Sequence, residues 1–116
     1  MTGLNKVLLI GNVGAKPEIK RSQSGEPIAH LRVATSSVRQ RDGEDVKETE
    51  WHDVVAFGKL ADVCEKFVDK GRLVYIEGRL QSHTWQDKSG AKRLQREVVA
   101  RRLDMLERKP TTASAI

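Results

Sequence analysis

Two aromatic residues on one predicted strand are the residues whose type and spacing first suggest a chemistry. Positions 50–61 read EWHDVVAFGKLA, which is typical of a strand, a glycine and the start of a helix. Trp51 and Phe57 have the same strand parity, so both rings would project from one face, about 20 Å apart. Asp53 lies between them on that face, which argues against simple burial of both rings in a core. Rings along a half-polar strand favour stacking on the bases of a nucleic acid.

The remaining aromatic residues carry different interpretations. Trp85 lies near the end of a predicted strand, on a polar face and beside a turn, and we interpret it as a third stacking residue. Tyr75 shares that face, and it either stacks on a base or buries its ring while its hydroxyl makes a hydrogen bond. Phe67 falls on the apolar face of a predicted helix and is expected in the core.

The balance of charge favours an anionic partner. The 21 Lys and Arg residues exceed the 16 Asp and Glu residues, and the isoelectric point is near 9.6. Any single cation could be a solvated surface charge, but together they predict a basic surface with salt-dependent affinity for phosphates. The residues that we expect to contact phosphates are Arg32, Arg41, Lys59, Arg72, Arg79, Lys92, Arg93 and Arg96.

The residue types that catalysis or metal binding would need are present but scattered. His30, His52 and His83 lack the close spacing of a metal site. Cys64 lies on the apolar face of the predicted helix and is expected to act as a small hydrophobic residue. Acidic residues are spread along strands, so a metal-dependent nuclease is a weak alternative. We expect a binding protein that is not an enzyme and has no metal and no cofactor.

Strands with short connections and one helix must position these residues. Alternating apolar residues and turn signals predict the strands, and apolar residues spaced by three and four predict a helix over 60–70, capped by Gly71. The residues 37–48 are predicted to form a long mobile hairpin tip around Asp42 and Gly43, and a phase break near Ala100 predicts a bulge. The expected strands are 5–13, 19–21, 28–36, a strand that ends at 57, 73–85 and 92–106.

This order of elements predicts one all-β domain. It fits a five-stranded closed Greek-key barrel with one helix between strands three and four. The barrel domain is expected over 1–107, and the polar residues 108–116 are expected to be a flexible C-terminal tail. Gly11 is expected to let the first strand bend.

The first strand is apolar on both faces, which is unusual for a half-exposed strand. One face can fill the barrel, and the other predicts a second subunit. The expected interface residues are Lys6, Leu8, Ile10 and His52.

The compartment follows from what the sequence does not contain. Its single cysteine excludes an internal disulfide and fits a reducing environment. The sequence shows neither a signal peptide nor an apolar stretch of membrane-spanning length. We therefore expect a cytoplasmic protein associated with the nucleoid.

Several motifs together resemble the bacterial single-stranded DNA-binding protein family. They are LNKV leading to GNVG, EWH followed by FGKLA, and KG followed by VYIEG and Trp85, and the match runs from about Leu4 to Met105. The resemblance implies an OB fold, a homotetramer, and coating and protection of single-stranded DNA without sequence preference in replication, recombination and repair. It also implies base stacking by Trp51, Phe57 and Trp85.

This sequence departs from the family pattern in two places. The family often has a further tryptophan where Arg39 stands, and arginine can stack through a cation–π contact. The family usually ends in an acidic tip that recruits replication and repair proteins, whereas this sequence ends in Ala-Ser-Ala-Ile, so such partners stay open. An OB-fold accessory protein of replication restart, or an RNA-binding protein, remains the alternative.

Overall fold

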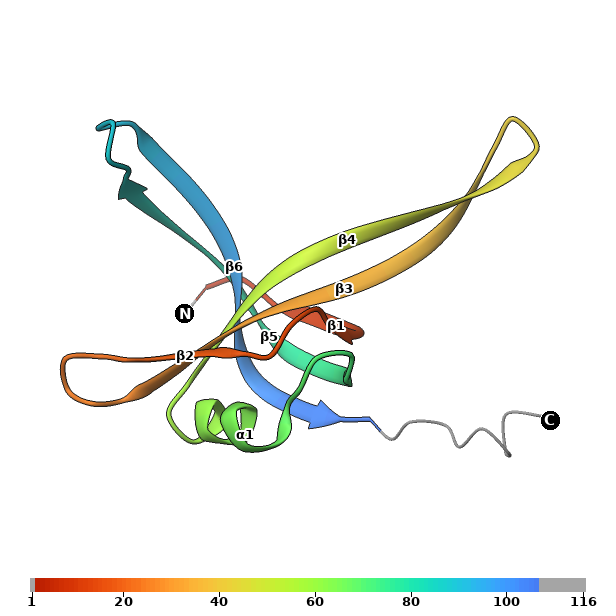
Figure 1. Ribbon diagram of the computed structural model, residues 1–116. Coiled ribbons are helices and arrows are strands. Elements are labelled where there is room, and N and C mark those ends of the chain that lie inside the picture. Colours follow the sequence, from red (N-terminus) through yellow and green to blue (C-terminus); the bar gives the residue numbers. More distant parts are fainter. Residues whose placement is uncertain (1, 107–116) are drawn as a thin grey trace.

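The computed structural model describes residues 2–106, so the predicted tail at 108–116 lies outside the described residues. Figure 1 shows a small barrel from which two long ribbons extend in different directions, with one helix at the other end. The elements are β1 (Val7–Val13), β2 (Glu18–Arg21), β3 (Pro27–Arg41), β4 (Glu44–Phe57), α1 (Lys59–Phe67), β5 (Leu73–Gln86) and β6 (Lys92–Met105).

The sheet closes on itself. Its strand order is β1-β5-β6-β4-β3-β2, and an additional antiparallel pairing joins β1 to β3. The barrel therefore has five strands, with β2 attached only to β3 and α1 between the third and fourth barrel strands, as the sequence predicted. β4 and β6 pair in parallel, and the other neighbouring strands pair antiparallel.

Gly11 lies where β1 passes from β5 to β3. It pairs with Val74 of β5, and the next residue, Asn12, pairs with Ala34 of β3 as well as with β5. A Cβ at Gly11 would lie 2.3 Å from the carbonyl oxygen of Ala34. The strand thus needs glycine here because two backbones approach closely.

Alternate residues of the strands fill the barrel. Ala29, Leu31 and Val33 of β3 are buried, and the residues between them face outward. Burying such a side chain fully contributes about 1.5–3 kcal/mol for Val, Leu or Ile. α1 covers one end of this core through Ala61 and Cys64, both of which are fully buried.

The helix ends earlier than predicted, and one core prediction is wrong. α1 ends at Phe67, because Val68 already has extended backbone angles (φ −92°, ψ 129°). Gly71 lies beyond the helix end, in a turn at φ 87°. Phe67 is 60% exposed rather than buried. The buried residues of α1 are Ala61 and Cys64, and Phe67, the last residue of the helix, lies outside the side that they form.

The strands β3 and β4 continue through the segment that was predicted to be a hairpin tip. Their register runs without a break to the pair Arg41 and Glu44. Asp42 (φ 53°) and Gly43 (φ 80°) form the turn, and two positive φ angles are what a two-residue type I′ turn requires. We call residues 36–49 the β3–β4 arm.

The expected bulge is confirmed in β6. Gly78 pairs with Ala100 and Glu77 pairs with Arg102, which leaves Arg101 as the extra residue. Beyond the bulge, β5 and β6 form the second ribbon of Figure 1. We call residues 82–96 the β5–β6 arm.

Candidate nucleic-acid interface

Trp51, Phe57 and Trp85 mark one outer side of the sheet, which we call the aromatic face. In the β3–β4 ladder, Trp51 lies opposite Ala34 and Phe57 lies opposite Ile28, with six residues of regular strand between them. Their shared side of β4 is therefore as predicted. These three residues are 46%, 43% and 47% exposed. Each ring thus keeps part of its surface available to a partner.

The face continues from β4 to Trp85 across β6. Val55, on the same side of β4 as Trp51, pairs with Val99 of β6. Val55 is buried but is not one of the residues that fill the barrel core. Its side chain therefore lies on the outer side of the sheet, between the rings. Further along β6, Arg93 pairs with Trp85 of β5. One continuous surface therefore joins the three rings.

Trp51 packs against the chain on more than one side. A Cβ at Gly14 would lie 2.4 Å from an atom of the Trp51 ring, so only glycine leaves room for the indole there. The Arg32 guanidinium carbon lies 4.9 Å from the ring centroid, within cation–π range. Arg32 Nε also lies 3.5 Å from Asp53 Oδ1. Both groups of this ion pair are well exposed, so the pair orients Arg32 more than it stabilises the fold.

The turn of the β5–β6 arm fixes an arginine beside Trp85. Arg93 Nε donates to Asp87 Oδ2 at 2.8 Å. Asp87 Oδ1 accepts from the Ser89 hydroxyl and from the backbone N–H groups of Ser89 and Ala91. These bonds, first those from Ser89 and Arg93, lower the pKa of the Asp87 carboxyl. The charge of Arg93 is therefore held next to a candidate stacking ring.

The other predicted phosphate contacts are spread over the molecule. Lys59 begins α1 two residues after Phe57, and Arg79 lies on the Trp85 side of β5. Lys92 and Arg96 lie on the opposite side of the β5–β6 arm from Trp85, by register. Arg41 lies at the turn of the β3–β4 arm, and Arg72 lies before β5, where its carbonyl accepts from Val13.

Arg39 does not share the side of Trp51. The register of the β3–β4 arm places Val38, which is 67% exposed, on the Trp51 side and Arg39 on the other. Arg39 Nη1 donates to Glu48 Oε1 at 3.2 Å. A nucleic-acid strand that stacked on both Trp51 and Arg39 would have to wrap around the β3–β4 arm.

Tyr75 lies beside the predicted subunit interface rather than among the stacking rings. It pairs with Ile10 of β1, while Leu8 pairs with Glu77. Leu8 and Ile10 are 57% and 58% exposed. The Tyr75 hydroxyl donates to Glu77 Oε1 at 2.9 Å, which raises the pKa of Tyr75 and lowers the pKa of Glu77.

Two cations lie near Glu77, beside the exposed Leu8 and Ile10. Arg101 Nη2 lies 3.2 Å and Lys6 Nζ lies 3.9 Å from Glu77 Oε2. His52, the fourth residue predicted at a subunit interface, shares a 2.9 Å hydrogen bond between its Nε2 and Thr35 Oγ1. That bond joins β3 to β4 on the side opposite Trp51.

Two residues of the aromatic face were not predicted to lie there: Gly14, and Glu97, which the sequence offered only as one of several acidic residues spread along strands. The contact of Gly14 with Trp51 has no local signal in the sequence, because the tryptophan lies far along the chain. Glu97 is buried on β6 with its side chain only 10% exposed. Its place at an outward position of a strand on the aromatic face could have drawn attention to it.

Over residues 2–106, no cluster of three or more His, Cys, Asp or Glu side chains is arranged to hold a metal ion. Within the same range, no helix has the length and apolar character needed to cross a membrane.

Comparison with known proteins gives one consistent family. Residues 4–106 match the single-strand binding protein family. A single-stranded DNA-binding protein of Rhizobium meliloti is 56% identical over 99 residues, covering 83% of this chain and 57% of that protein. Single-stranded DNA-binding protein 1 of Chlorobaculum tepidum is 46% identical over 106 residues, covering 90% and 65%. The chain thus spans less than two thirds of the length of these relatives.

Two solved structures share the fold. The Plasmodium falciparum SSB in its complex with single-stranded DNA is 31% identical, with a TM-score of 0.84 over 92% of this chain and 98% of that one. A deletion mutant of the single-stranded DNA binding protein from Thermus aquaticus is 30% identical, with a TM-score of 0.79 over 90% and 51%. Sequence and fold agree, and the chain belongs to the single-strand binding protein family.

Proposed function

We propose that this chain binds single-stranded DNA without sequence-specific readout of a target site, and that it coats and protects the strand during replication, recombination and repair. Base stacking on Trp51, Phe57 and Trp85 would supply much of the affinity. Phosphate contacts from nearby cations would supply the rest. Membership of the family and the DNA complex formed by the Plasmodium falciparum relative support the substrate.

The observation that carries this proposal is the half-exposure of all three rings on one continuous face. A ring that served only the core would be enclosed by apolar neighbours. Instead, Trp51 lies next to Arg32 and Trp85 lies next to Arg93. A flat ring beside a cation suits a base and its phosphate together.

Fluorescence titration with a mixed-pyrimidine oligonucleotide tests the proposal. Binding should quench tryptophan emission, and each stacked base contributes about 1–3 kcal/mol. Phe57→Ala should therefore weaken affinity by roughly 5- to 150-fold. Phe67→Ala is the matched control, because Phe67 is also exposed but lies on α1, away from the aromatic face. Equal losses in both variants, or no quenching at low salt, would refute stacking.

Competition between nucleic acids separates this function from its alternatives. A stacking face needs unpaired bases, so a duplex of equal length should compete poorly. Single-stranded RNA that competes better than DNA would favour an RNA-binding protein instead. We propose no enzymatic activity, so labelled single strands incubated with the protein and Mg²⁺ should stay intact.

We further propose that the exposed side of β1 joins subunits, in a homotetramer. Leu8 and Ile10 expose apolar surface next to Tyr75, while Glu77 and its cations border it. Leu8→Asp combined with Ile10→Asp should dissociate the assembly, as measured by light scattering at micromolar concentration. A monomeric unsubstituted chain would contradict this proposal.

The cytoplasm, in contact with nucleoid DNA, is the location that we propose, and a fluorescent fusion can test it.

A further inference from the structure

The side chain of Asn5 takes the place of a backbone pair just before the start of β1. The register of β1 on β5 ends at the pair Val7 and Gly78, and its continuation by two residues brings Asn5 opposite Leu80. Asn5 Nδ2 donates to the Leu80 carbonyl oxygen at 2.7 Å, and the Leu80 N–H donates to Asn5 Oδ1 at 2.8 Å. A hydrogen-bonded pair of an antiparallel ladder exchanges two such bonds, and a side-chain amide offers the donor and the acceptor that they need. The Asn5 amide therefore extends the ladder where the backbone of β1 has left it.

These two bonds lie where the β5–β6 arm leaves the barrel. The bulge at Arg101 interrupts the β5–β6 ladder beside Gly78, and a bulge bends and twists the strands. Within residues 2–106, no strand pairs with the edge of β5 that faces away from β6 beyond Gly78. A cavity of about 580 Å³, whose lining includes Asn5, Gly78 and Arg101, opens at this place. Side-chain packing is therefore sparse here, and the hydrogen bonds of Asn5 carry much of the attachment of β5.

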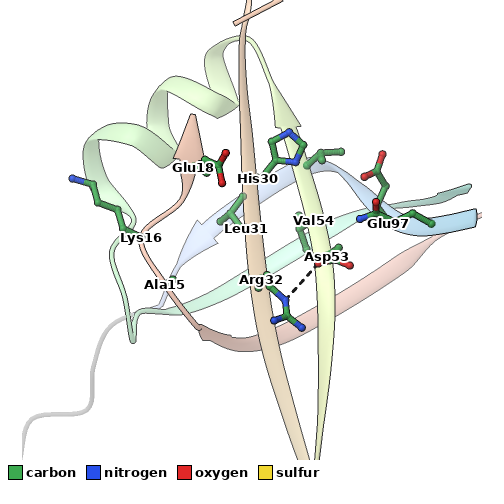
Figure 2. A pocket seen from close by; sticks show the side chains of 11 residues that line it. Ala15, Lys16, Glu18, His30, Leu31, Arg32, Asp53, Val54 and Glu97 are labelled. Atoms are coloured by element: carbon green, nitrogen blue, oxygen red, sulfur yellow. Dashed lines mark ion pairs between the residues drawn. The ribbon is translucent and has the colours of Figure 1, made fainter. Parts of the chain in front are cut away.

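The other edge of the arm is attached to the barrel through β6. Val98 pairs in parallel with Val54 of β4. Figure 2 shows Val54 beside the stretch of β6 that carries Glu97. The arm is thus held on one edge by β4 and on the other by Asn5. Without the Asn5 amide, the arm would be free to rotate about its β6 edge.

A small rotation at Leu80 has a large effect on Trp85. Trp85 lies five residues beyond Leu80 on β5, which corresponds to about 17 Å of extended strand. A rotation of about 10° at Leu80 would therefore move the ring by about 3 Å. Atoms in contact lie roughly 3.5–4 Å apart, so this displacement is large enough to break a stacking contact.

We propose that Asn5 is a positioning residue for the binding of single-stranded DNA. Its side-chain amide fixes the direction in which the β5–β6 arm leaves the barrel, and the arm in turn places Trp85 relative to Trp51 and Phe57. Asn5 acts through Trp85 rather than through a contact with the DNA strand. This inference rests on the proposed function.

A double-mutant cycle tests this role, with affinity measured from the anisotropy of a labelled mixed-pyrimidine oligonucleotide. Asn5→Ala should weaken binding about 3- to 10-fold, which is part of what one stacked base contributes. In a Trp85→Ala background, the same substitution should change affinity less than about 2-fold, because the ring that it displaces is absent. In a Phe57→Ala background, the full loss should remain. Equal losses in the two backgrounds, or no loss when Asn5 alone is replaced, would overturn the inference.

Asn12→Ala is the matched control. Asn12 Nδ2 also donates to a backbone carbonyl, that of Gly71 at 3.2 Å, but at the end of β1 away from the β5–β6 arm. The effect of this substitution on affinity should be the same with and without Trp85. Coupling of Asn12 to Trp85 as strong as that of Asn5 would show a general loss of rigidity and would overturn the inference.

Hydrogen exchange in the unsubstituted protein needs neither a variant nor DNA, so it decides the matter even if Asn5→Ala does not fold. The Leu80 amide should be protected by Asn5, whereas the Ser82 amide, on the same unpaired edge of β5, should exchange fast. Equal exchange rates at Leu80 and Ser82 would overturn the inference. Failure of the unsubstituted protein to bind any single strand would instead refute the proposed function, and the exchange rates would still show whether Asn5 holds the arm.

Discussion

The guanidinium carbon of Arg32 lies 4.9 Å from the centre of the Trp51 ring, and Arg32 Nε lies 3.5 Å from Asp53 Oδ1. A base that approaches Trp51 therefore meets a cation already placed over the indole. It can stack on the planar guanidinium or displace it. We therefore propose that Arg32 takes part in the stacking contact at Trp51 and is more than a distant phosphate ligand.

Substituting Arg32 in two ways separates its charge from its planar shape. Arg32→Lys keeps the charge but loses planar stacking, and it should weaken single-strand binding about 2- to 5-fold, the size of an exposed cation–π contact. Arg32→Gln should weaken binding further and reduce the salt slope by about one unit. Affinities measured over a salt series check both. A lysine variant equal to the unsubstituted protein would show that only the charge matters.

Gly14 should be essential to the position of Trp51. Gly14→Ala places a methyl group where the indole ring now lies, and such overpacking destabilises a protein by about 1–3 kcal/mol. Urea unfolding measures this loss, and the emission of the displaced tryptophan should shift to the red. In a Trp51→Ala background the same substitution should cost little, because the ring is gone. Equal losses in both backgrounds would place the strain elsewhere.

Cys64 should make stability fall at high pH. Burial raises the pKa of its thiol from 9.0 to about 11. The unfolded chain ionises first, so the stabilisation is fully present below pH 9 and is lost as pH rises toward 11. A shift of this size corresponds to about 2–3 kcal/mol.

Urea unfolding at pH 8 and at about pH 11 measures this loss. Cys64→Ala is the control, because it keeps every other group that titrates in this range. The variant should show a smaller decrease in stability than the unsubstituted protein. Parallel pH profiles would contradict the assignment.

Asp87 should make the β5–β6 arm sensitive to acid. Its pKa lies below the ordinary value of 3.8, because Ser89, Arg93 and Ala91 donate to the ionised form. The resulting stabilisation is present above pH 3.8 and is lost as pH falls through the lower folded pKa. Emission from Trp85, followed in a Trp51→Phe background, should change over that range. Asp87→Asn should abolish the transition, and a transition that persists would arise from another group.

Local signals in the sequence determined much of this fold. Alternating apolar residues identified the strands, and the shared parity of Trp51 and Phe57 placed both rings on one side. Asp42 and Gly43 identified a turn that needs positive φ angles, and the phase break in the last strand identified the bulge at Arg101. These features depend on neighbouring residues, so a single sequence reveals them.

Other features depend on residues that are distant in the sequence. The end of α1 and the exposure of Phe67 depend on which side of the helix the barrel covers, and helix periodicity alone defined that side too broadly. The length of the β3–β4 arm depends on pairing between two polar strands, which have no apolar pattern to predict it.

The sequence alone determined a basic all-β barrel with three aromatic residues available for stacking. Only the tertiary structure decided what surrounds those rings: Gly14 beside Trp51, Arg32 over it, and Glu97 within the face that joins them. The physical reason is that barrel closure brings β1, β3, β4 and β6 together across long stretches of chain. A side chain's own sequence neighbourhood carries no record of contacts made in that way.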